Sequence, residues 1–224
     1  MALTDAAILQ IKRMILAGDL RPGDRLPPEK ELSESLGLSR SSLREAVKAL
    51  EVIRVLDVRR GDGTYVTSLR PEVLLGALSF VADVQQDSSV LQLLAVRRIL
   101  EPEAAALATA RAAPADAARL RALLDQVSAT TPVDDLVAHD LVFHRSLCEL
   151  SGNDYLTGLL DSLSGSTLRA RVWRGLTQDG AVERTLTEHR AIVEAVGSGD
   201  AALVRALVTV HVSGVGLWLE RALG

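Results

Sequence analysis

The stretch GLSRSSLREAVKAL, residues 37–50, predicts a helix whose two sides differ in chemistry. With about 100° between successive residues of an α-helix, one side is apolar and, carried on to residue 53, consists of Leu43, Ala46, Val47, Leu50 and Ile53. The other side carries Arg40, Ser41, Arg44, Glu45 and Lys48. Like charges one turn apart destabilise an isolated helix by a few tenths of a kcal/mol per pair, roughly. The spacing of the three cations therefore indicates an anionic partner that offsets their repulsion.

Two more helices are expected before this one. The first begins near Thr4, a suitable N-cap, and stops at Gly18. The second begins at Pro28, which suits a first helical turn, and ends at Gly37, after which Ser39 caps the third helix. The order helix, helix, short turn, helix is typical of helix-turn-helix proteins, whose last helix enters the major groove of DNA.

A short hairpin is expected directly after the third helix. VLDV (55–58) and TYVTS (64–68) have strand composition, and RRGDG (59–63) joins them. Such a hairpin would form a wing beside the helices, and its tip would bring three residues to the DNA backbone or minor groove: Arg59, Arg60 and Gly61. A charged outer face is common to amphipathic helices in general, so the three helices and the wing together carry the prediction of a winged helix-turn-helix.

The distribution of charge predicts two domains. The net charge is −4, but residues 1–70 hold 12 Lys+Arg and 10 Asp+Glu, which gives +2, whereas the remaining 13 and 19 in residues 71–224 give −6. We therefore expect a DNA-binding domain over 1–70 and a domain with a different partner over 71–224.

The second domain is expected to be all-helical, so the fold class is mainly α. The chain is 48% hydrophobic and only 3% aromatic, and Pro and Gly residues divide residues 71–224 into a bundle of six to seven helices. The expected helices span about 72–85, 88–112, 115–128, 133–151, 154–173, 180–197 and 200–222.

The location is expected to be cytoplasmic. Cys148 is the single cysteine, which allows no internal disulfide and fits a reducing compartment. The N-terminal segment lacks the features of a signal peptide. The longest apolar runs, such as VLLGALSFVADV (73–84), fall short of the roughly 18–20 residues that cross a bilayer, so we expect no contact with a membrane.

Four polar side chains of the second domain fall on apolar helix faces. In DDLVAHDLVFHRSLCEL (134–150), Asp140 and His144 lie about 40° apart within the apolar arc, while His139 falls on the outer side. His189 and His211 likewise share the apolar faces of their own helices. An unpaired carboxylate in a core costs many kcal/mol, so Asp140 requires a partner.

Three imidazoles and one carboxylate suit a divalent transition metal, with zinc first and nickel, manganese or iron as alternatives. Each histidine taken alone is more often a hydrogen-bonded core residue. Periodicity shows only that Asp140, His144, His189 and His211 face inward, and it does not show that they meet.

Two arginine-containing segments are candidates for binding an effector. Arg97 and Glu101 lie one turn apart on the inner face of LLAVRRILEPEAAALA (93–108), where they form either an internal salt bridge or a grip for the carboxylate of an effector. Arg171 in STLRARVWRG (166–175) is a further candidate, with Arg169 and Arg174 near it on other faces.

The first domain resembles the N-terminal domain of the GntR family of bacterial transcriptional regulators over residues 4–68. The resemblance is carried by GDLRPGDRLPPEKELSESLGLSRSSLREAVKALE (18–51) followed by RRGDGTYV (59–66). It implies DNA contacts at Lys30, Ser39, Arg40, Ser41, Ser42, Arg44 and Gly61. Lys30 stands where an arginine is usual, and Arg54 replaces the glycine that usually ends the recognition helix.

Residues 72–222 resemble the ligand-binding domain of the FadR-type (FCD) subgroup of that family, through DLVFH (140–144), EHRAIVEAVGSGD (188–200) and a late histidine. The resemblance implies metal ligands at Asp140, His144, His189 and His211 and an effector contact at Arg97. It predicts a homodimeric DNA-binding transcriptional regulator, most simply a repressor. The regulator would bind a palindromic double-stranded operator, and its affinity for this operator would be controlled by a small organic acid bound at the metal.

Two alternatives stay open at this point. One is a metalloenzyme that acts on a small carboxylate and carries an accessory DNA-binding domain, since a metal held by Asp and His can activate water. The placement of Glu188 on the outer face of its helix, with no other carboxylate clearly beside the site, argues against it, because a general base is then missing. The other alternative is a structural metal without an effector.

Overall fold

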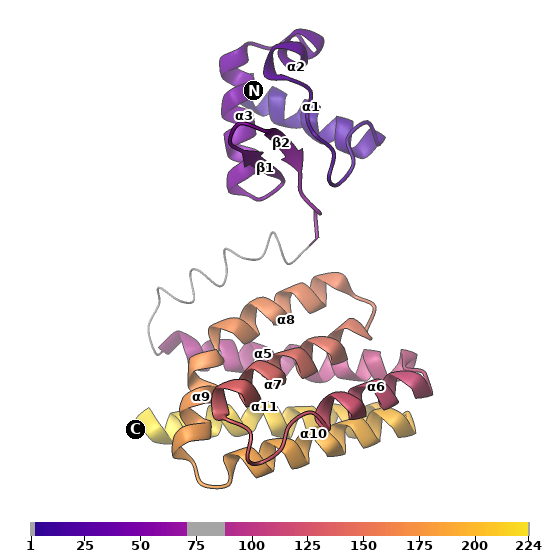
Figure 1. Ribbon diagram of the computed structural model, residues 1–224, viewed down its shortest axis with the longest axis vertical. Helices are drawn as coiled ribbons and strands as arrows, with labels where there is room; N and C mark the ends of the chain where they lie inside the picture. Colours follow the sequence, from indigo (N-terminus) through magenta and orange to yellow (C-terminus); the bar gives the residue numbers. More distant parts are fainter. Residues whose placement is uncertain (1–2, 71–87, 224) are drawn as a thin grey trace. The chain divides into compact units, whose positions relative to one another are not determined.

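The computed structural model describes residues 3–70 and 88–223 (Figure 1). The chain divides into two compact units, residues 1–74 and 75–224. The helix expected over 72–85 lies outside the described residues.

The first unit is a winged helix-turn-helix. Its elements, in chain order, are α1 (Leu3–Ala17), α2 (Glu29–Leu36), α3 (Arg40–Val52), β1 (Leu56–Arg59) and β2 (Gly63–Val66). The strands pair antiparallel from Leu56 opposite Val66 to Arg59 opposite Gly63. The predicted order of elements is confirmed, with boundaries that shift by a few residues.

The ends of α3 are set by local chemistry. At its start, the Ser39 hydroxyl accepts the backbone N–H of Ser42 at 3.0 Å, as an N-cap should. Beyond its end, Arg54 has a φ of 60°, and its N–H donates to the carbonyl of Glu51 at 2.9 Å. An arginine therefore adopts the left-handed conformation for which glycine is usual, at some cost in backbone strain.

The apolar side of α3 packs into the core of the first unit. This core consists of Ile11, Leu20, Leu26, Leu32, Leu43, Leu50, Leu56 and Val66. Leu43, Ala46 and Leu50 are buried as predicted. Ile53 is an exception with 56% of its surface exposed, because the helix has ended before it and the chain turns away at Arg54.

The second unit is a bundle of helices. In the described residues these are α5 (Ser88–Arg111), α6 (Pro114–Leu124), α7 (Val133–Glu149), α8 (Asp154–Ser166), α9 (Leu168–Thr177), α10 (Ala181–Ser198) and α11 (Ala201–Leu223). The mainly helical class is confirmed.

The prediction of one helix over 154–173 is wrong, because the chain breaks at Thr167 between α8 and α9. Thr167 is fully buried. Its hydroxyl lies 3.2 Å from the carbonyl of Ser164, to which it donates, and accepts a hydrogen bond from Arg97 Nη1 at 2.7 Å. A threonine hydroxyl that bonds back to the preceding turn competes with the helix for its carbonyls.

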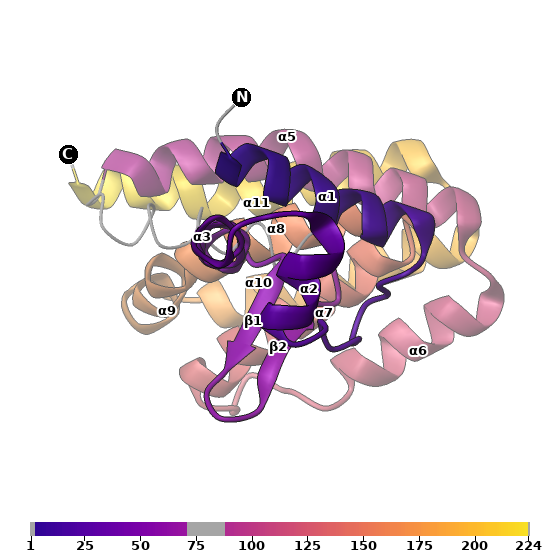
Figure 2. The same cartoon turned by 90° about the horizontal axis from the view of Figure 1, so that it is seen from above.

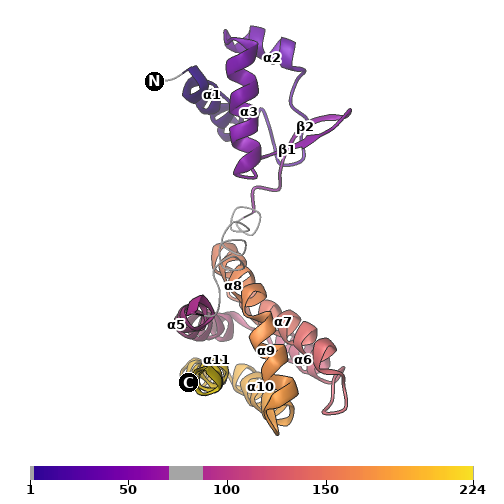
Figure 3. The same ribbon diagram turned by 90° about the vertical axis from the view of Figure 1, so that its left-hand side faces the viewer.

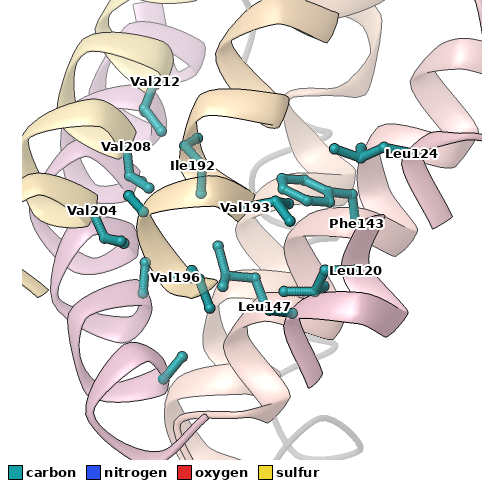
Figure 4. Packing of buried hydrophobic residues seen from close by; sticks show 14 residues of the cluster. Leu120, Leu124, Phe143, Leu147, Ile192, Val193, Val196, Val204, Val208 and Val212 are labelled. Atoms are coloured by element: carbon teal, nitrogen blue, oxygen red, sulfur yellow. The ribbon is translucent and has the colours of Figure 1, made fainter. Parts of the chain in front are cut away.

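The bundle core is built from side chains of α5, α6, α7, α10 and α11. Figure 4 shows Phe143 of α7 beside Leu124 of α6 and Val193 of α10, with the valines of α11 on the other side of Ile192. Helices α5 and α11 lie side by side along their length (Figure 2 and Figure 3). This packing brings α7, α10 and α11 close enough for their inward polar side chains to meet.

Among the described residues, α11 is the one helix that is long and apolar enough to cross a membrane by length and composition alone. The sequence predicted no such segment. Val204, Val208 and Val212 of α11 are buried in the bundle, together with His211, so one face of α11 packs in the core of this unit.

Candidate metal centre and nucleic-acid interface

The four predicted ligands converge at one place inside the bundle. Asp140 and His144 lie one turn apart on α7, His189 lies on α10 and His211 on α11, and all four are buried. One ligand atom from each lies within 4.8 Å of all the others. Periodicity shows only that the four side chains face inward, whereas the structure shows that they meet, because three helices bring them to one point.

The distances within this cluster suit a bound ion. His211 Nε2 lies 3.1 Å from His144 Nε2 and 3.3 Å from His189 Nε2. Asp140 Oδ1 lies 3.3 Å from His189 Nε2 and 3.6 Å from His144 Nε2. Ligand atoms about 2.1 Å from a transition metal are separated from their neighbours by roughly 3.0–3.4 Å in octahedral or tetrahedral geometry.

Two carboxylates determine which imidazole nitrogens can face an ion. Glu188 Oε2 lies 2.8 Å from His211 Nδ1, and Glu101 Oε2 lies 3.1 Å from His144 Nδ1. An Nδ1 that faces a carboxylate carries the proton, so the Nε2 of the neutral ring holds a lone pair. Two such lone pairs at 3.1 Å repel each other unless a cation or a proton lies between them. The donor set therefore fits a divalent metal.

The ionisation of these side chains differs between them. Burial lowers the pKa of His144, but Glu101 and Asp140 outweigh it and raise this pKa to about 9. Burial lowers the pKa of His189 to about 3, so this ring is neutral. Burial raises the pKa of Asp140, but His144 and Arg171 more than offset this and hold it well below its usual range. A metal must therefore displace a proton from His144.

Arg97 and Glu101 form a buried pair next to the cluster. The guanidinium of Arg97 forms a buried ion pair with Glu101 and donates to Thr167, while Glu101 faces His144. Among the described residues, neither Arg97 nor Glu101 lines the cavity next to the cluster. The internal salt bridge is the arrangement observed, and the effector contacts at these two residues stay a prediction.

A cavity of about 60 Å³ adjoins the cluster and is lined by Asp140, His189 and His211. Arg171 and Arg174 also line it, and both are buried, whereas Arg169 is exposed. Arg171 forms an ion pair with Asp140 and donates to the carbonyl of Ser164. Apolar side chains complete the wall, among them Val137, Leu186 and Val215.

Three sequence expectations about this site need correction. Glu188 is half-buried and bonded to His211 rather than turned outward, and Glu101 is a second carboxylate beside the site. His139 is also half-buried, with Nε2 2.8 Å from the carbonyl of Leu123, and it lines the cavity. Arg174 is a cavity residue whose place periodicity did not single out. Each of these contacts joins residues of different helices, so no pattern within one helix signals it.

The polar face of α3 and the start of α2 form an exposed surface of cations and hydroxyls, with Glu29 and Glu45 among them. Lys30, Ser39, Arg40, Ser41 and Arg44 are all exposed there. Ser42 differs from them in that only 8% of its surface is exposed, and its contact with DNA stays a prediction. Its hydroxyl lies 2.8 Å from the hydroxyl of Ser39, to which its N–H is also bonded, because the third residue of a capped helix turns toward the cap.

The tip of the wing is exposed at Arg60 and Gly61, and Gly61 has a φ of 75° that favours glycine. Arg59 is also exposed but is held within the hairpin. Its Nε lies 3.0 Å from Asp57 Oδ2, and its guanidinium lies 4.2 Å from the centre of the Tyr65 ring. Arg60 is therefore the wing cation with the greater freedom to reach a phosphate.

Comparison with known proteins gives matches over both units. Residues 3–66 match the model described as bacterial regulatory proteins, gntR family, and residues 92–214 match the FCD domain. The HTH-type transcriptional regulator LutR of Bacillus subtilis is 31% identical over 208 residues, which cover 90% of this chain and 94% of LutR. The putative L-lactate dehydrogenase operon regulatory protein of Escherichia coli K12 is 30% identical, covering 98% of this chain and 87% of that protein.

A solved structure described as Streptococcus agalactiae GntR has the same fold. It superposes with a TM-score of 0.74 at 25% identity, covering 95% of this chain and 98% of that one. The relatives are regulators of transcription, and these matches support the regulator and not the metalloenzyme alternative.

Proposed function

This chain belongs to the GntR family of bacterial regulatory proteins, and with that as premise we propose that it is a cytoplasmic, homodimeric repressor controlled by a small organic acid. The protein is a DNA-binding transcriptional regulator and not an enzyme.

Binding to DNA is assigned to the exposed cationic face of α3. The N-terminal turn of α3 carries Arg40 and Ser41, and Arg44 follows one turn later. Arginine can donate two parallel hydrogen bonds to O6 and N7 of guanine, and hydroxyls and helix N-termini suit phosphates. Lys30 and Arg60 would add phosphate contacts from α2 and from the wing.

Two copies of the chain are needed to bind the two half-sites of a palindromic operator. A two-fold symmetric dimer would place one α3 in each of two successive major grooves. An effector that favours a dimer geometry with a different spacing between these helices would then release the DNA by population shift.

The metal is assigned to Asp140, His144, His189 and His211, and the observation that carries this is the approach of the imidazole Nε2 atoms. Three nitrogens and one oxygen suit zinc, and nickel, manganese and iron accept the same donors. When bound, such an ion supplies positive charge and open coordination positions to a ligand in the cavity.

The cavity suits a small anion. Arg171 and Arg174 bring two cations to a space that, among the described residues, is bounded by one carboxylate, that of Asp140. A volume of about 60 Å³ accommodates roughly four to six water-sized groups. A short hydroxy acid is of this size, and one relative is named for an L-lactate dehydrogenase operon. We infer that the effector is a small hydroxycarboxylic acid whose carboxylate faces Arg171 and Arg174.

Replacing Arg44 with alanine should weaken binding to the operator by about 1–3 kcal/mol, roughly fivefold to 150-fold, if Arg44 contacts a guanine. The operator can be obtained by selecting duplexes from a randomised pool with the wild-type protein, and affinity is then measured by fluorescence anisotropy. Arg13→Ala, which removes an exposed cation from α1, is the matched control. Operator affinity that is unchanged in a folded Arg44→Ala protein would refute the assignment.

A further inference from the structure

Arg44 is held by a carboxylate from the neighbouring helix. Arg44 Nη2 lies 2.8 Å from Glu29 Oε1, and Arg44 Nε lies 3.3 Å from Glu29 Oε2. Glu29 is the first residue of α2, and Arg44 lies in the second turn of α3. The contact is bidentate and joins the two helices of the helix-turn-helix.

This contact leaves the DNA-binding edge of the guanidinium open. A guanidinium has five N–H donors in a rigid plane, and Glu29 takes the edge formed by Nε and Nη2. The end formed by Nη1 and the second N–H of Nη2 stays available, and two donors in parallel match O6 and N7 of guanine. Arg44 can therefore bind Glu29 and a guanine at the same time.

The other acidic side chain bonded to a cation of α3 makes a different contact. Glu45 forms one hydrogen bond, at 2.9 Å, with Lys48 on the same helix. A single bond within a helix leaves the lysine free to rotate, and Lys48 is a point charge without a plane to orient. Glu45 therefore serves as a comparison that carries the same charge on the same surface.

We propose that Glu29 is a positioning residue that fixes the plane of Arg44 and thereby sets the base preference of the recognition helix. The inference rests on the proposed contact of Arg44 with DNA. Holding a long side chain in its bound orientation lowers the entropy that binding must supply. A carboxylate near DNA also repels the phosphates of every duplex alike. Glu29 therefore strengthens binding on balance only at the sequence that Arg44 contacts, and it weakens binding to unrelated DNA.

These opposite effects give the test. In the full chain, Glu29→Gln should lower affinity for the selected operator duplex by about threefold to tenfold, while affinity for an unrelated duplex of the same length stays equal or rises. The ratio of the two affinities therefore falls. Glu45→Gln removes the same charge but no hydrogen bond to Arg44, and it should change both affinities alike and leave the ratio intact. Thermal unfolding of each variant confirms that the domain is folded.

A double-mutant cycle completes the experiment. In an Arg44→Lys background the planar guanidinium is absent, so Glu29 has no bidentate contact to make. Glu29→Gln should then no longer lower the ratio of operator affinity to affinity for unrelated DNA. An unchanged ratio in Glu29→Gln, or equal changes in Glu29→Gln and Glu45→Gln, would overturn the inference. Arg44→Ala separates the two claims, because loss of operator binding in that variant upholds the contact of Arg44 with DNA even where the role of Glu29 fails.

Discussion

Replacing His189 with glutamine will weaken the binding of Zn²⁺ by more than about 100-fold, since even the loss of a residue that supports a ligand costs 10-fold to 100-fold. His189 is fully buried and its ring is neutral, so it can bind a metal without a net loss of a proton. Its ring also stacks on Phe143, with centroids 4.2 Å apart, which holds Nε2 toward Asp140 and His211. Glutamine has similar length but lacks this orientation.

The affinity is measured by competition with a chromophoric chelator. His139→Gln is the matched control, because His139 is on α7 beside the cluster but bonds to the carbonyl of Leu123. It should bind Zn²⁺ within about threefold of the wild type, the range expected for a side chain that is not a ligand. Equal losses in both variants would show that the effect comes from disturbed packing and not from a lost ligand.

The affinity for Zn²⁺ will also rise about tenfold for each pH unit between pH 6 and pH 8, because binding displaces one proton. That proton belongs to His144, whose pKa is raised to about 9 by the carboxylates of Glu101 and Asp140 against the effect of burial. Below this pKa the metal-free protein holds the proton, so each unit of acidification favours the metal-free form. Above it the dependence should level off.

Chelator competition at three pH values measures this slope, and calorimetry in buffers of different ionisation enthalpy counts the proton directly. Glu101→Gln is the informative variant, because it removes one of the two charges that raise the pKa of His144. The slope should then level off at a lower pH than in the wild type. An affinity that does not change from pH 6 to pH 8 in the wild type would contradict the assignment of His144 as a protonated ligand.

The first unit could be predicted almost entirely from the sequence, because its determinants are local. The cap at Ser39 and the left-handed turn at Gly37 each depend on residues within four positions of one another. The break at Thr167 could not be predicted, since it involves Arg97, which is 70 residues away in the sequence. Local pattern favours a continuous helix there, and a tertiary contact overrides it.

For the candidate metal centre, the sequence predicts which side chains face inward but not how they are arranged. Helical periodicity identified Asp140, His144, His189 and His211 because each faces inward, which is a property of one helix. Their convergence depends on the positions of α7, α10 and α11 relative to one another along their axes. The sequence of a single helix does not determine these positions. The same holds for Glu188, which reaches His211 from another helix.

The most direct test of the central claim is the effect of a small acid on operator binding with and without the metal. With Zn²⁺-loaded protein and the selected operator duplex, L-lactate or another short hydroxy acid should lower affinity by roughly 5-fold to 150-fold, the range of typical coupling between two sites. The metal-stripped protein and His189→Gln should bind DNA but should not respond to the acid. A panel of short hydroxy acids that leaves operator affinity unchanged, or that acts equally on loaded and stripped protein, would contradict the account.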